Sequence, residues 1–148
     1  MKHCLLLLCF ITSLLFSANF CALNAQIVRD GIKIKVFTKF HKSSTSKPKS
    51  IELKESELLD ESGIICCSPD EFDRIELSGN ETVTVKVHEG FDEELGDVVF
   101  LIKDFPLYRT KATFKPLEGR DDMGWYTVFI LKGDKILLQF KYRFMSCT

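Results

Sequence analysis

The stretch "DDMGWYTVFILKGDKILLQFKYRF", residues 121 to 144, contains two alternating apolar segments joined by "KGDK". Alternation with a period of two is typical of a β-strand whose two sides face different surroundings. Gly133 followed by Asp134 favours a tight turn between the segments. We therefore predict a β-hairpin, whose inward-facing side chains would be Tyr126, Val128, Ile130, Ile136, Leu138, Phe140, Tyr142 and Phe144.

Further strand signals precede this hairpin. "GIKIKVFTKF" alternates in the same way, and "ELSGNETVTVKV", "GDVVFLIKD" and "YRTKATFKPL" are rich in β-branched and aromatic residues between turn residues. One segment differs, because "IELKESELLDESG" predicts a short helix with Leu53, Leu58 and Leu59 on one side and its end at Gly63. The pattern as a whole predicts an all-β, mostly antiparallel structure.

The hairpin entrance resembles a known family. Immunoglobulin-superfamily domains enter their sixth strand through D-x-G-x-Y-x-C, and Asp122, Gly124, Tyr126 and Val128 stand at that spacing, with valine in place of cysteine. The resemblance covers residues 73–145 and implies an antiparallel, immunoglobulin-like β-sandwich with an N-terminal extension. It also implies that the Tyr126 ring is buried and that its hydroxyl bonds to backbone at the corner.

The resemblance extends to earlier strands. "ELSGNETVTVKV" is similar to the second strand of the family, and "GDVVFLIKD" would be the third, with Phe100 where the family commonly packs a tryptophan. An ion pair between Asp122 and Arg109 is implied as well. The inward side chains of the second strand would be Val83, Val85 and Val87.

Three segments divide the chain. Residues 1–25 have the layout of a secretory signal peptide, with Lys2, an apolar run and small residues before Ala25. The apolar run is shorter than the ~20 residues of a membrane-spanning helix, which is the alternative interpretation. We expect a secreted, extracellular product in which residues 26–72 form a strand, a linker and a short helix, and residues 73–148 form the β-sandwich, all within one domain.

Charge is unevenly distributed along this chain. Eight basic and two acidic residues lie between Arg29 and Lys54, whereas two basic and fourteen acidic residues lie between Glu55 and Asp97. The near-neutral total gives no reason to expect nucleic acid as a partner. The basic segment either binds acidic surfaces such as sulfated sugars or neutralises the acidic middle of the chain.

Outside the predicted signal peptide three cysteines remain, namely Cys66, Cys67 and Cys147. An odd number in an oxidising compartment implies at least one unpaired or intermolecular thiol. A bridge from Cys66 or Cys67 to Cys147 and three reduced, buried thiols are both compatible with the sequence. Asn80 begins the sequon "NET" on a predicted turn and is a candidate glycosylation site.

No catalytic motif is found, so we expect no enzymatic activity. His41 and His88 belong to no Cys/His or H-E-x-x-H arrangement. The acidic clusters "SPDEFDR" and "GFDEELGD" lack the D-x-D-x-D-G pattern of a calcium loop. No cofactor or metal is therefore predicted.

The expected function is binding of a protein partner, or self-association, through the outward side of the hairpin sheet. Exposed apolar patches commonly mark such sites. The alternative is that residues 32–40 or 53–59 cover this surface. A second hypothesis is a carrier of a lipid or small hydrophobic ligand, because the chain has thirteen phenylalanines and its last hairpin also looks like that of secreted lipid-recognition sandwiches. The partner-binding candidates are Trp125, Phe129, Leu131, Val99, Leu101 and Leu137.

Overall fold

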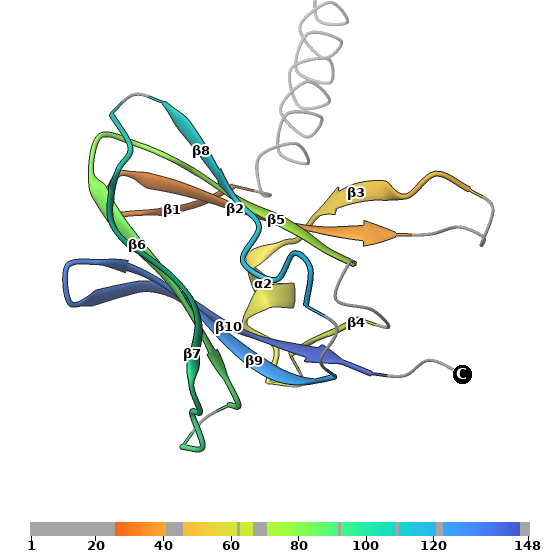
Figure 1. The fold of residues 1–148 in the computed structure, drawn as a ribbon. Helices are drawn as coiled ribbons and strands as arrows, with labels where there is room; N and C mark the ends of the chain where they lie inside the picture. The colour runs from red at the N-terminus through yellow and green to blue at the C-terminus, as the bar shows by residue number, and fades with distance from the viewer. Residues whose placement is uncertain are drawn as a thin grey trace, which may run out of the picture.

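The protein is all-β, as the alternation predicts. A computed structural model describes residues 26–40, 46–61, 63–66, 71–91, 93–108, 110–120 and 123–145. In these residues it contains ten strands and one short helix, arranged in two five-stranded sheets that face each other (Figure 1). Within this part of the chain, no helix has the length and apolarity needed to cross a bilayer.

The sheet that we call sheet A is antiparallel. Its strand order is β1-β2-β5-β8, and β3 pairs with the C-terminal half of β2, from Phe37 to Phe40. The strands are β1 (Ile27–Arg29), β2 (Ile32–Phe40), β3 (Lys49–Glu52), β5 (Phe72–Ser78) and β8 (Lys111–Phe114).

Sheet B has the order β4-β10-β9-β6-β7, in which β4 runs parallel to β10 and the other pairs are antiparallel. The chain reaches it from sheet A through α2 (Glu55–Leu58). The strands are β4 (Ile64–Cys66), β6 (Thr82–Glu89), β7 (Val98–Pro106), β9 (Gly124–Lys132) and β10 (Lys135–Phe144).

One hydrophobic core lies between the sheets. It joins Ile32, Ile34 and Val36 of β2 to Val128 and Ile130 of β9, all fully buried. Residues 26–72 and 73–145 therefore share a core, and the boundary expected between residues 72 and 73 falls inside β5. The alternation of β2 is confirmed, since its lysines at 33 and 35 lie on the opposite side from the buried residues.

The predicted helix is much shorter than its sequence segment. α2 forms a single turn, and Leu58 is buried in the core whereas Leu59 is 56 % exposed. The expectation that both leucines face one side is wrong, because Leu59 already lies beyond the last helical residue. Ile51 and Glu52, at the start of the predicted helical segment, belong to β3 instead.

The C-terminal hairpin forms as predicted, with Gly133 and Asp134 between paired Lys132 and Lys135. One detail of the alternation is wrong. The register of β10 against β9 shifts between Ile136 and Leu138, which is a β-bulge. A bulge inserts one residue, so Ile136 before it is out of step with Leu138, Phe140, Tyr142 and Phe144 after it, which are buried as predicted. Leu137 consequently packs in the core at 6 % exposure and Ile136 is 49 % exposed, the reverse of the prediction.

The strand order differs from the one that the immunoglobulin resemblance implies. In that family the second and sixth strands belong to opposite sheets. Here the corresponding strands, β6 and β9, are hydrogen-bonded neighbours in sheet B. In sheet A, β2 pairs with β5. An immunoglobulin-like arrangement is therefore not confirmed. Arg109 and Asp122, the implied ion pair, lie outside the described residues.

Candidate functional site

The predicted outward surface of sheet B is largely covered at Trp125. Its ring lies 4.7 Å from the ring of Phe91, measured between centroids, and the Arg143 guanidinium lies 5.1 Å from its centre. On another side Gly63 is so close that a β-carbon there would lie 3.2 Å from the indole. Phe91, Arg143 and Gly63, the residue before β4, thus bury much of the Trp125 side chain.

Phe129 is also buried, at 8 % exposure, although it is not part of the core between the sheets. It lies in the middle of sheet B, where Lys86 and Gln139 are its cross-strand neighbours. The Lys86 ammonium lies 5.4 Å from the ring centre, and the His88 ring packs edge-on at 5.8 Å. Polar side chains of the same sheet therefore shield Phe129 from water.

The remaining candidates do not form a continuous surface with these two. Leu101 is 52 % exposed, Leu131 and Val99 are half-buried, and Leu137 belongs to the core. The six candidates therefore do not form one exposed apolar surface. The outward side of sheet B is covered neither by β2 nor by Leu58, because both contribute to the core between the sheets.

A different apolar region lies between the edges of the two sheets. β7 and β8 are the last strands of sheets B and A on one side of the molecule (Figure 1). The register of β7 against Val83, Val85 and Val87 of β6 directs its side chains at 100, 102 and 105 towards sheet A. Phe105 contacts Phe114 of β8, with ring centroids 5.3 Å apart. We call this apolar edge of the core the β7–β8 opening; it consists of the partly exposed Phe100, Ile102 and Phe105 and the buried Ala112 and Phe114.

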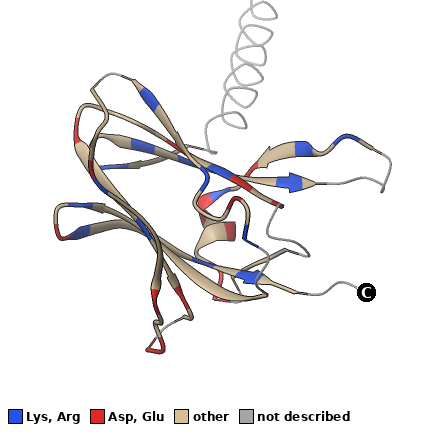
Figure 2. Cartoon of the chain, in the orientation of Figure 1, with Lys and Arg blue, Asp and Glu red and all other residues tan. Residues whose placement is uncertain are grey.

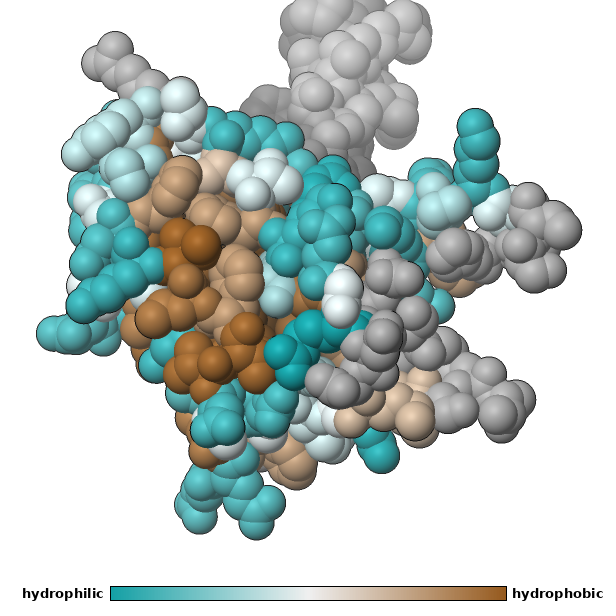
Figure 3. Space-filling model, viewed as in Figure 1, coloured by the Kyte–Doolittle hydropathy of each residue, from teal (hydrophilic) through white to brown (hydrophobic). Residues whose placement is uncertain are grey.

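This side of the core remains accessible. The inward valines of β6 are at most 1 % exposed, whereas Phe100 and Ile102 are half-buried and Phe105 is 36 % exposed. Figure 3 shows hydrophobic surface gathered over the front of the molecule between β7 and β8. On the opposite side, Leu58 of α2 fills the space between the sheets at 1 % exposure. Leu53 and Ile64 beside α2 are also half-buried against the core, so the two sides differ mainly in Phe105, the most exposed of these inward-facing side chains.

Sequence reasoning missed this opening, although one signal was present. The run "VVFLI" at 98–102 is apolar at every position, whereas a strand that faces water on one side alternates. Such a run is typical of a strand with apolar surroundings on both sides. Because β7 is an edge strand, part of that apolar surface faces outward instead.

Several Lys and Arg residues lie along the strands of sheet A (Figure 2), and its outer side carries charged side chains. Glu76 is only 7 % exposed there and accepts hydrogen bonds from Lys111 and Arg74, each at 2.7 Å. Burial alone would raise the pKa of this carboxyl, but the two cations outweigh it and hold the pKa below its usual range. The carboxylate therefore stays charged within a basic surrounding.

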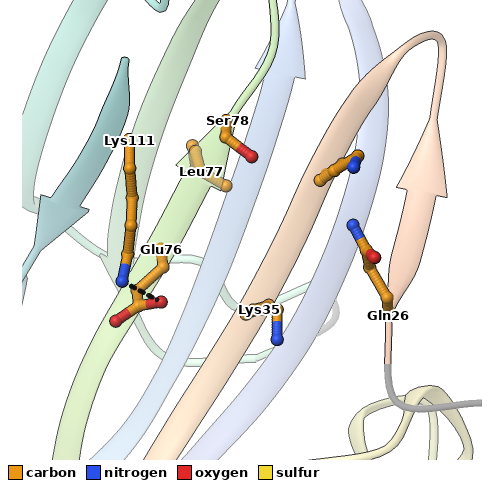
Figure 4. Close-up of a pocket in the computed structure, with 7 residues that line it drawn as sticks. Gln26, Lys35, Glu76, Leu77, Ser78 and Lys111 are labelled. Atoms are coloured by element: carbon orange, nitrogen blue, oxygen red, sulfur yellow. Dashed lines mark ion pairs between the residues drawn. The ribbon is translucent and has the colours of Figure 1, made fainter. Parts of the chain in front are cut away.

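A shallow pocket of about 200 Å³ lies beside this carboxylate (Figure 4). Figure 4 shows Lys111 of β8 joined to Glu76 of β5, with Lys35 on β2 and Gln26, the residue before β1, on the other side of the pocket. The pocket lining consists of Gln26, Lys33, Lys35, Glu76, Leu77, Ser78 and Lys111.

The other predicted sites are placed as follows. Asn80 is exposed in the connection between β5 and β6. The backbone of Cys66 pairs with Phe144 at the edge of sheet B, while Cys67, Cys147 and His41 lie outside the described residues. In the part of the chain that the structure describes, no three or more His, Cys, Asp or Glu side chains are grouped so that they could hold a metal ion.

Comparison with known proteins gives no match: no protein-family model, no curated protein and no solved structure matches the chain at a significant level.

Proposed function

We propose that the protein is a non-enzymatic, secreted binding domain that takes up the acyl chain of a lipid at the β7–β8 opening. The observation that carries the proposal is the partial exposure of Phe100, Ile102 and Phe105, whose side chains face the interior. Interior apolar surface in contact with water is unfavourable, and a ligand that covers it is stabilised by the hydrophobic effect.

The chemistry of the interior favours a long, apolar ligand. Among the described residues, the buried polar side chains other than tyrosine are Glu76 and Thr127, and both lie on outer sides of their sheets. Interdigitating side chains fill the roughly 10 Å between facing sheets, so the ligand would lie along the partly exposed edge of the interior, beside Phe100, Ile102 and Phe105. The signal-peptide pattern of residues 1–25 and the exposed sequon at Asn80 support an extracellular setting.

The proposal predicts how affinity depends on chain length. Each buried CH₂ contributes about 0.8 kcal/mol, so the Kd of saturated fatty acids should fall about fourfold for each added carbon until the opening is filled. Isothermal titration with fatty acids of about eight to sixteen carbons measures this slope. A Kd that is independent of chain length would contradict the proposal.

Two neighbouring residues of β7 provide a matched pair of variants. Ile102→Glu places a charge in the opening and should abolish binding, because an unpaired carboxylate is costly to bury against an acyl chain. Leu101→Glu introduces the same charge on the outward side and should bind like the parent. If Ile102→Glu does not fold, as checked by circular dichroism, Ile102→Gln replaces it. Equal loss of binding in both variants would exclude the opening as the site.

A second candidate function is protein binding or self-association through the outward side of β7. The observation in its favour is that Leu101 and Val98 are 52 % and 47 % exposed on an edge strand. Edge strands of this kind can pair with a second chain. Sedimentation of the parent and of Leu101→Glu tests it, since a dimer that the variant converts to monomer would support this function.

A further inference from the structure

We propose that the outer side of sheet A holds a second binding site, which takes a tetrahedral oxyanion group, either phosphate or sulfate. The site is a row across three strands, Lys33 of β2, Ser78 of β5 and Lys111 of β8. It is independent of the acyl-chain proposal, because it lies on the outer side of sheet A and not between the sheets.

The sheet register assembles this row. Lys33 pairs with Ser78, and Ser78 pairs with Lys111. The residues that flank them in sequence, such as Ile32, Ile34 and Leu77, are fully buried towards the core. Side chains on adjacent positions of a strand point to opposite sides, so all three members of the row face outward.

The charges around the row leave an excess of positive charge. The nearby carboxylates are already neutralised, since Glu76 accepts from Lys111 and Arg74, and Glu52 accepts from Lys35 at 2.8 Å. Within the described chain, the Lys33 ammonium has no carboxylate within 4.0 Å and is exposed. The pocket therefore attracts an anion and repels a cation.

The donor set favours a tetrahedral oxyanion over a carboxylate. The Lys33 ammonium of β2, the Ser78 hydroxyl of β5 and the Gln26 amide just before β1 line the pocket. The Lys111 ammonium keeps two further donors beside the one that it gives to Glu76. These donors can approach several oxygens of one group from different directions. A planar carboxylate is better matched by the fork of an arginine. The one arginine beside this pocket, Arg74, is engaged by Asp73 and Glu76.

The site is tested by NMR titration of the ¹⁵N-labelled protein at constant ionic strength with inorganic phosphate, inorganic sulfate and a monosaccharide sulfate. Saturable shifts of the Lys33, Ser78 and Lys111 amides are expected with at least one ligand. Tighter binding of the sugar sulfate than of inorganic sulfate would assign the group to an ester, and the reverse would assign it to a free ion. Absence of saturable shifts with all three would overturn the proposal.

Lys33→Gln is the decisive variant, because Lys33 makes no ion pair in the described structure whose loss would affect folding. The Kd for the anion should rise about tenfold on loss of one charge-assisted hydrogen bond. Lys103→Gln, which removes an exposed lysine of β7, is the matched control and should leave the Kd unchanged. Equal weakening in the two variants would indicate general charge attraction and overturn the proposal.

Discussion

Gly90 fixes the segment that covers Trp125. Its φ is +82°, and a β-carbon there would lie 2.0 Å from the carbonyl oxygen of Glu94. Its amide donates to the carbonyl of Trp125 at 2.8 Å, and its own carbonyl accepts from the Thr127 hydroxyl at 2.8 Å. Only glycine fits this position, and these bonds hold the next residue, Phe91, over the indole.

Glu76 is the residue whose charge should matter most for stability. Because its pKa is lower in the folded state than in the unfolded state, it stabilises the fold above the unfolded-state pKa, and this contribution is lost as the pH falls through about 4.5 and below. Glu76→Gln should lower the free energy of unfolding by about 1 kcal/mol at pH 7. The difference from the parent should shrink in urea titrations at pH 4 and below.

Glu118 offers the control for this comparison. It pairs only with Lys115 among the described residues, and its side chain is 65 % exposed. Exposed pairs contribute little, so Glu118→Gln should behave like the parent at both pH values. A pH-independent effect of Glu76→Gln would show that the carboxylate acts through packing and not through its charge.

At the scale of single elements, the bulge in β10 decides whether Ile136 or Leu137 belongs to the core. Leu137→Ala should lower the free energy of unfolding by about 2–4 kcal/mol, because it leaves a cavity between the sheets. Ile136→Ala, on the other side of the strand, should cost less than about 1 kcal/mol. Urea denaturation measures both values. A larger loss for Ile136→Ala would mean that β10 runs without a bulge.

The strands themselves follow from the sequence, because alternation is a local property that each segment carries. β2, β6 and β9 bury the side chains that their patterns indicate. The bulge at Leu137 was not predictable, since both Ile136 and Leu137 are apolar and the pattern fits either register. The same limit applies to α2, whose charged residues favour a helix but do not determine its length.

At the scale of the whole molecule, alternation indicates which side of a strand is buried but not which sheet contains the strand. The strand order, with β6 beside β9, therefore could not be obtained from the pattern, and the resemblance implied a different one. The burial of Trp125 in the predicted partner surface could not be foreseen for the same reason. Phe91 is distant in sequence from Trp125, and nothing in either segment indicates their contact.

The two sides of the core differ in a way that only the assembled sheets reveal. The connection from sheet A to sheet B runs through α2 and closes one side with Leu58. The opposite side ends in two edge strands, which leave the β7–β8 opening apolar and accessible (Figures 1 and 3). This asymmetry is the basis of the proposed acyl-chain site.

The most direct test of that site is an NMR measurement with a fatty acid that carries a nitroxide at the end of its chain. Paramagnetic broadening falls steeply with distance from the nitroxide and so locates the chain end. We expect selective broadening of signals from Phe100, Ile102 and Phe114. Broadening centred on Trp125 and Phe129, or none above that of a nitroxide without the acyl chain, would contradict binding between the sheets.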